Sequence, residues 1–149
     1  MKKVNIIAAG KIKEKCFIDA IDIYAKRLTR LCRLNIIEVP DYPDSVVSVK
    51  LEGEHMAKHL GAYNISLDIG GSLLSSEELS YTMDKAYIST PEINFFVGGS
   101  RGLCSTIKAK CNMSVSFGRV TYPHQLMRVI LVEQVYRAFM ISGGVSYHK

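Results

Sequence analysis

The sequence predicts a single-domain α/β fold, with a mostly parallel sheet and helices on both faces. Short apolar runs rich in β-branched residues alternate with amphipathic stretches from one end of the chain to the other, as in sheets built from strand–helix–strand units. The 149 residues contain no repeat, linker or low-complexity run, and 48% hydrophobic and 22% charged residues are the usual mixture of a globular domain. We therefore expect one domain over residues 1–149.

Five segments are predicted strands because each is a short apolar run that stops at a turn-forming residue. They are residues 4–10, 34–40, 63–71, 92–99 and 113–120.

Five further segments are predicted helices, at about residues 16–33, 46–60, 75–88, 103–110 and from Pro123 onward. In the first, apolar residues recur at steps of four and three as far as Leu31. Ser75 and Glu78 have the spacing of a capping box, which predicts a helix start. Proline suits the first turn of the last helix.

The last predicted helix is apolar almost all the way round, interrupted by Arg128, Glu133 and Arg137. A surface helix of a small protein usually needs only one apolar stripe. This composition indicates a helix that is covered on more than one side.

Charge and cysteine content narrow the function classes only partly. A net charge of +5 is compatible with a polyanionic partner, although an ordinary solvated basic face has the same charge. The four cysteines form no Cys-x-x-Cys pair and no histidine pair has zinc-site spacing, so we expect reduced thiols and no metal. We also expect no signal peptide, no membrane span and a cytoplasmic location.

Glycine-bearing loops follow three of the predicted strands, at residues 67–71, 97–102 and 117–122. Ligands of open α/β sheets bind beyond the carboxyl ends of the strands, where glycine lets a ligand approach the backbone closely. These loops predict a pocket for a flat nucleoside or amide-rich ligand, and the alternative is that the glycines only make turns. Phosphate-loop, dinucleotide and nucleophile-elbow motifs are absent from the sequence.

Two histidines are candidate functional residues. His124 begins the last helix, where the helix dipole disfavours a protonated imidazole, so it is either a neutral hydrogen-bond donor or a capping or packing residue. Tyr147, His148 and Lys149 end the chain and offer a donor, a titrating base and a cation. The alternative for this tail is a frayed end.

Three stretches together, "FFVGGSRGL", "VTYPHQLMRVILVEQVYRA" and the terminal "YHK", resemble the large-subunit ribosomal RNA pseudouridine N3-methyltransferases of the SPOUT, or α/β-knot, class. "AAGKIKEK", "YAKRL", "IIEVPD" and "LLSSEEL" are also similar to that family, so the resemblance runs through the whole chain.

The resemblance implies a deep trefoil knot in the C-terminal half, S-adenosylmethionine held in a bent form by the knot loops, and a homodimer formed largely by the last helix. Arg128, Glu133 and Arg137 would then be satisfied polar groups at or near the partner contact. The alternative from the residues alone is a core helix of a monomer.

Position by position, the resemblance also implies site residues. The tail residues Tyr147 and His148 would be catalytic, in an active site formed with the other subunit. The cofactor contacts would be Leu67, Gly98, Phe117, Gly118, Arg119, Val120, Thr121 and Tyr122. The chain departs from the family at Ser72, where lysine is usual, and in a shorter segment between Pro40 and Leu60.

The implied reaction is methyl transfer to N3 of a pseudouridine in 23S ribosomal RNA, on the assembled ribosome. Whether His148 acts as a base or stabilises the developing anion stays open. RNA phosphates would meet Lys11, Lys13, Lys15, Arg101 and Arg119. The alternatives are a SPOUT methyltransferase acting on another RNA, such as transfer RNA, and a non-catalytic RNA-binding dimer.

Overall fold

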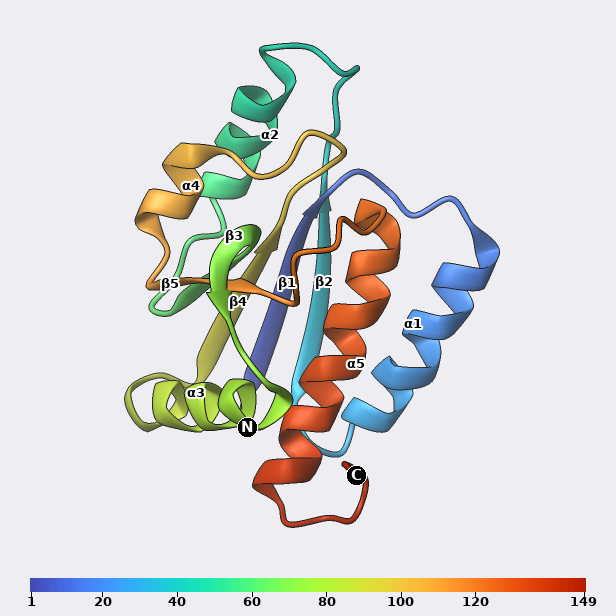
Figure 1. The fold of residues 1–149 in the computed structure, drawn as a ribbon, viewed down its shortest axis with the longest axis vertical. Helices are drawn as coiled ribbons and strands as arrows, with labels where there is room; N and C mark the ends of the chain where they lie inside the picture. The colour runs from blue at the N-terminus through green and yellow to red at the C-terminus, as the bar shows by residue number, and fades with distance from the viewer.

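The computed structural model, which describes residues 1–149, confirms the alternation of strands and helices (Figure 1). The strands are β1 (Lys3–Ala9), β2 (Arg33–Val39), β3 (Asn64–Leu73), β4 (Glu92–Val97) and β5 (Met113–Ser116). The helices are α1 (Lys15–Leu28), α2 (Ser48–Ala57), α3 (Ser76–Ser89), α4 (Ser105–Lys110) and α5 (His124–Ser142). All neighbouring strands are parallel, in the order β2-β1-β4-β3-β5.

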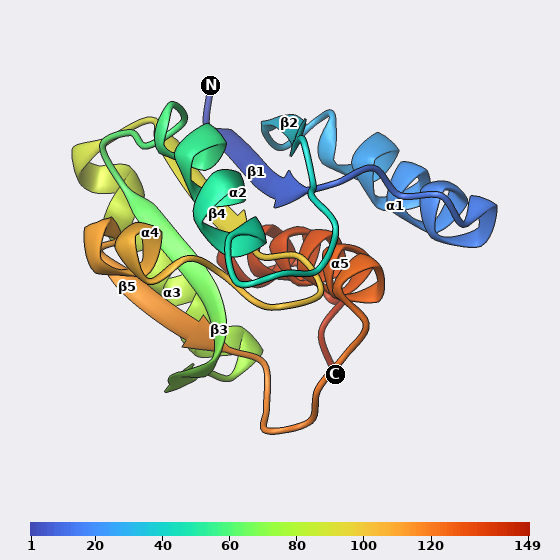
Figure 2. The same ribbon diagram turned by 90° about the horizontal axis from the view of Figure 1, so that it is seen from above.

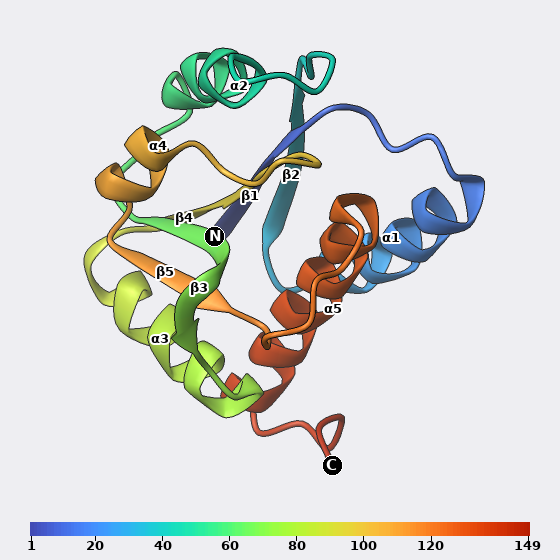
Figure 3. The ribbon, with the colours of Figure 1, turned by 45° about the horizontal axis from the view of Figure 1, so that its top comes forward.

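Helices cover both faces of the sheet, as predicted (Figures 2 and 3). Successive residues of a strand point to opposite faces, and β1 shows this directly. Val4, Ile6 and Ala8 join the larger core cluster, which includes residues of α1, α3 and α5. Ile7 and Ala9 join a smaller cluster with residues of α2 and α4. The sheet is thus buried on both sides, which explains its near-continuous apolar strands.

Four asparagines lie in one row across the sheet. Asn35, Asn5, Asn94 and Asn64 occupy paired positions on β2, β1, β4 and β3. Asn35 Nδ2 donates to Asn5 Oδ1 at 2.8 Å, Asn5 Nδ2 to Asn94 Oδ1 at 2.8 Å, and Asn94 Nδ2 to Asn64 Oδ1 at 3.1 Å. We call this row the asparagine ladder. It gives polar groups near the amino ends of four strands a partner inside the sheet.

The predicted boundaries of two elements, α1 and β5, were wrong by the largest margins. Helix α1 ends at Leu28 and not near residue 33, because the Leu31 N–H bonds the Leu28 carbonyl at 2.8 Å in a closing turn and Arg33 then pairs with Lys3 as β2. Strand β5 ends at Ser116 and not at residue 120. The Ser116 hydroxyl accepts from the Gly118 N–H at 3.2 Å and donates to the Gly118 carbonyl at 2.8 Å, which closes a turn.

The capping box that starts α3 is confirmed. The Glu78 N–H donates to the Ser75 hydroxyl at 3.1 Å, and the Ser75 N–H donates to the Glu78 carboxylate at 2.8 Å. Both contacts satisfy N–H groups that the first turn of a helix leaves without an intrahelical acceptor.

Helix α5 packs against both α1 and α3 over its own sheet (Figure 1). Leu131, Val132 and Val135 are fully buried there. Leu126 and Ile130, by contrast, are half-buried. One apolar side of the helix is therefore explained by the chain's own core, and a second side keeps accessible apolar surface. The trefoil knot and the dimer stay predictions.

None of the helices combines the length and apolarity needed to cross a bilayer. No group of three or more histidine, cysteine, aspartate or glutamate side chains is arranged to hold a metal ion.

Candidate functional site

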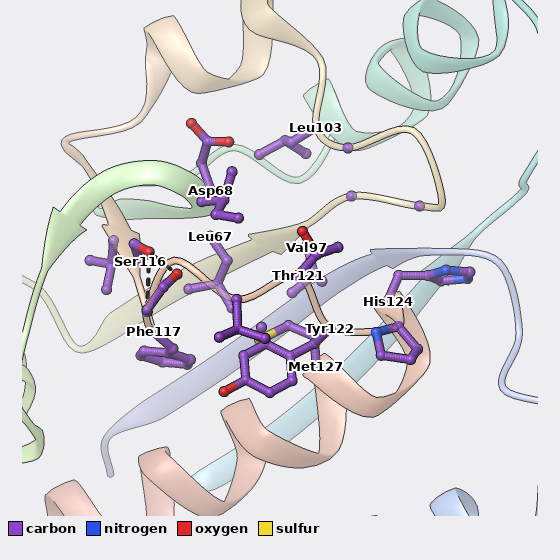
Figure 4. A pocket seen from close by; sticks show the side chains of 18 of the residues that line it. Leu67, Asp68, Val97, Leu103, Ser116, Phe117, Thr121, Tyr122, His124 and Met127 are labelled. Carbon is purple, nitrogen blue, oxygen red and sulfur yellow. Dashed lines mark hydrogen bonds between the residues drawn. The ribbon is translucent and has the colours of Figure 1, made fainter.

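A cleft of about 550 Å³ opens at the carboxyl ends of β3, β4 and β5 (Figure 4). Its walls come from the three glycine-bearing loops and the first turn of α5. The prediction that these loops meet at one edge of the sheet is therefore confirmed. They meet because β3 lies between β4 and β5, an order that brings segments distant in sequence side by side.

The cleft is lined by all but one of the residues expected to contact a cofactor. These lining residues are Leu67, Gly98, Phe117, Gly118, Val120, Thr121 and Tyr122. Arg119 does not line it and is exposed to solvent. Gly118, the residue before Arg119, has a φ of +122°, a conformation that L side chains rarely adopt.

Glycine is required at position 98 by the close approach of the protein's own backbone, whether or not a ligand also approaches there. A Cβ at this position would lie 2.5 Å from Leu103 N and closer still to the carbonyl group of Gly102. The loop after β4 folds back on itself, with the Gly102 N–H donating to the Gly99 carbonyl at 3.0 Å. Gly98 thus allows the tight loop that forms one wall of the cleft.

His124 is the first residue of α5 and lines the cleft. Burial lowers the pKa of its imidazole, and the nearby charge of Arg128 lowers that pKa further, while Asp41 and Asp44 act in the opposite direction. The outcome supports the expectation of a neutral imidazole at this helix end.

Arg128 lies one turn further along α5 and is only 1% exposed. Its Nη1 donates to the Gly10 carbonyl at 2.7 Å and to Glu38 at 3.2 Å, and its Nη2 donates to the Ala9 carbonyl. Groups of the same chain therefore satisfy both Nη atoms of Arg128, while its buried Nε has no hydrogen-bond partner. That Arg128 lies at or near a partner contact stays a prediction. This side chain joins α5 to the ends of β1 and β2 within one chain.

Several apolar wall residues were not singled out from the sequence. Val97, Leu103, Val115 and Met127 all line the cleft. Each also belongs to, or packs against, a core cluster, so its residue type and spacing are those of any core position. Asp68 lines the cleft too, and its carboxylate lies 3.6 Å from the Lys108 ammonium.

The tail residues Tyr147 and His148 lie outside the cleft. The Tyr147 hydroxyl donates to Glu133 at 3.2 Å, and the His148 ring contacts Arg137 of α5. Because an α-helix rises 1.5 Å per residue, Arg137 is roughly 20 Å along α5 from His124 at the cleft. In this arrangement the tail is docked on the far half of its own last helix.

Residues 1–148 match a family model described as "Predicted SPOUT methyltransferase". The chain is 43% identical over 157 residues to the ribosomal RNA large subunit methyltransferase H of Clostridium acetobutylicum, covering 98% of this chain and 99% of the relative. The protein of the same name from Pediococcus pentosaceus has the same identity and coverage.

Two solved structures are similar in fold. A probable methyltransferase from Bordetella pertussis Tohama I has a TM-score of 0.63 at 12% identity, covering 93% of this chain and 96% of that one. The SpoU methyltransferase AviRb from Streptomyces viridochromogenes, in complex with AdoMet, has a TM-score of 0.50 at 12% identity, covering 95% of this chain and 58% of that one.

Proposed function

Because the chain belongs to the SPOUT methyltransferases, and within them to the ribosomal RNA large subunit methyltransferase H family, we propose that it methylates N3 of a pseudouridine in 23S ribosomal RNA with S-adenosylmethionine as donor. The observation that carries the proposal is the glycine-walled cleft in which the expected cofactor contacts, apart from Arg119, come together. Bound S-adenosylmethionine would supply the methyl group.

The cleft suits this cofactor in size and in chemistry. Its volume of about 550 Å³ falls in the range typical of small-molecule sites. Leu67, Val97 and Met127 provide apolar surface for an adenine ring and for the carbon chain of the methionine part. The backbone of the loops at Gly98 and Gly118 offers N–H and C=O groups for the polar edges of the ligand.

Exposed cations lie at the same edge of the sheet as the cleft and would meet RNA phosphates. Arg101 and Arg119 belong to the cleft loops and are exposed. Lys11 and Lys13 follow β1, and the Lys13 N–H donates to Gln125 at 3.3 Å, which holds that loop beside the start of α5. We expect these four side chains to contribute more than Lys15, whose ammonium already pairs with Asp19 at 2.7 Å.

We further propose that the active enzyme is a homodimer joined through α5. The half-buried apolar residues Leu126 and Ile130 supply a contact surface that the chain's own core does not use. A tail docked roughly 20 Å from its own cleft is better placed to serve the cleft of a partner subunit. Tyr147 and His148 would then complete an active site built from two chains.

The decisive experiment is an in vitro methylation assay that compares free large-subunit RNA, large subunits and whole ribosomes, read by mass spectrometry of the RNA. We expect methylated pseudouridine on whole ribosomes, because the α/β fold of residues 1–149 is small and an assembled ribosome offers it a large, preformed surface. A cytoplasmic location would follow from that substrate. Methylation of transfer RNA alone would replace this proposal. Absence of S-adenosylmethionine binding in calorimetry would favour a non-catalytic RNA-binding dimer.

A further inference from the structure

The His148 ring is held between two side chains of opposite charge. On one side, Arg137 Nη1 of α5 lies 3.1 Å from His148 Nδ1. On the other side, Glu77 Oε1 of α3 lies 2.6 Å from His148 Nε2. Both ring nitrogens are therefore engaged, and the chemistry of the two partners determines which nitrogen carries the proton.

A guanidinium group has five N–H donors and no acceptor. Arg137 can bond Nδ1 of His148 only if that nitrogen presents its lone pair. The proton of the neutral ring is then on Nε2, where it is donated to the carboxylate of Glu77. A doubly protonated ring would set an N–H against the guanidinium, with like charges facing each other. Of the two neutral tautomers, the arrangement thus selects the Nε2–H form.

The two contacts differ in how firmly they are held. Glu133 Oε1 accepts from Arg137 Nε at 2.9 Å, from Arg137 Nη2 at 2.5 Å and from the Tyr147 hydroxyl at 3.2 Å. The Glu133 and Arg137 side chains are only 16% and 24% exposed, and the guanidinium lies 4.8 Å from the centre of the Tyr147 ring. Glu77, by contrast, is 59% exposed. The Arg137 contact is therefore the fixed one, and another acceptor can replace Glu77.

We propose that His148 donates a hydrogen bond from Nε2 to a carbonyl oxygen of the target base, and that Arg137 is the positioning residue that fixes this tautomer. The inference rests on the proposed function and deepens it. When an imide nitrogen loses its proton, negative charge spreads to the flanking oxygens, and a donor held there stabilises it. The Glu77 carboxylate occupies the acceptor position in the free chain. The imide proton leaves to water, because the lone pair of His148 faces Arg137.

The tautomer can be measured without any substrate. The full chain contains four histidines, and long-range proton–nitrogen NMR correlations of ¹⁵N-labelled protein distinguish the two neutral tautomers of each. We expect the Nε2–H form for His148 at mildly alkaline pH, the same form in Arg137→Lys, which keeps a donor, and a mixture in Arg137→Met. Arg30→Met, at an exposed arginine, is the matched control and should leave the His148 signals unchanged. An Nδ1–H ring in the wild type, or an unchanged tautomer in Arg137→Met, would overturn the inference.

Activity separates a donor from a base. The amide of glutamine donates a hydrogen bond but does not take up a proton at neutral pH. We expect His148→Ala to be on the order of 100-fold slower than wild type, the loss typical of one missing anion-stabilising donor. His148→Gln should recover to within about tenfold of wild type by the same reasoning. Equal rates for the two variants would exclude the donor role. If the wild type methylates no ribosomal RNA, the proposed function fails, whereas the NMR measurement still decides the tautomer.

Discussion

Replacing Gly98 with alanine should deform the wall of the cleft. The added Cβ would lie 2.5 Å from Leu103 N, whereas ordinary contacts begin at 3.4 Å, so the loop after β4 has to move by roughly 1 Å. The atoms in the way belong to the backbone of Gly102 and Leu103 and cannot turn aside as a side chain does. Overpacking of this kind costs about 1–3 kcal/mol. For a chain of this length each kcal/mol lowers the melting temperature by roughly 2–4 °C.

The same displacement should weaken ligand binding, because Gly98, Gly102 and Leu103 all line the cleft. If about half of a strain of about 3 kcal/mol is relieved only in a loop shape that does not fit the ligand, S-adenosylmethionine affinity falls about tenfold, since about 1.4 kcal/mol corresponds to a factor of ten. Thermal unfolding and calorimetry measure the two effects. Gly99→Ala is the matched control for stability, because its Cβ would first meet the side chain of Glu52, at 3.3 Å. A Gly98→Ala chain with wild-type melting temperature and affinity would refute this reasoning.

Three further changes test other parts of the structure. Arg128→Met should lower the free energy of unfolding by about 3–5 kcal/mol in urea titrations, because Glu38 and two backbone carbonyls lose their buried partner; a loss below 1 kcal/mol would show that water replaces the guanidinium. The pKa of His124 is lowered in the folded chain, so as pH falls below about 6.5 the unfolded chain binds a proton there before the folded chain does. The free energy of unfolding should therefore fall from about pH 7.5 to about pH 5.5. His124→Gln should show a weaker fall in the same titration, and an identical slope would assign the effect to other groups. The double change Leu126→Lys and Ile130→Lys should give monomers in light scattering, and a persistent dimer would place the subunit contact elsewhere.

Much of the fold follows from local pattern, and the exceptions have identifiable physical causes. The period of apolar residues continues to Leu31, although α1 ends at Leu28, because Leu31 packs against the core from the turn that follows the helix. Strand β3 extends to Leu73, and its pairing with β5 shifts register after Leu67. This extension depends on the pairing with β5, so the local sequence does not reveal it. The order of the strands likewise depends on contacts between segments far apart in the chain.

The site was predictable where glycine marks a loop and hidden where apolar residues form its walls. Gly98 and Gly118 signal unusual backbone, and both line the cleft. Met127 has the spacing of a core residue and packs against the core. It also lines the cleft because it lies in α5 near the edge of the sheet where the cleft opens. From the sequence alone, Val132, Val135 and Ile130 are equally suited to a partner contact. In the structure Val132 and Val135 are fully buried in the chain's own core. Which side of an all-round apolar helix faces inward depends on how it meets the sheet.

The asparagine ladder ties together four positions that are far apart in the sequence. Every amide in it donates in the same sense, from β2 through β1 and β4 to β3, so each inner member is both the acceptor of one neighbour and the donor to the next. Exchanging Asn94 for leucine would leave Asn5 without an acceptor and Asn64 without one of its donors, at a cost larger than that of a single lost bond. A substitution at either inner position, Asn5 or Asn94, therefore removes two bonds of the row at once. We expect relatives of this chain either to keep all four asparagines or to have replaced all four. The four positions should therefore change together in evolution.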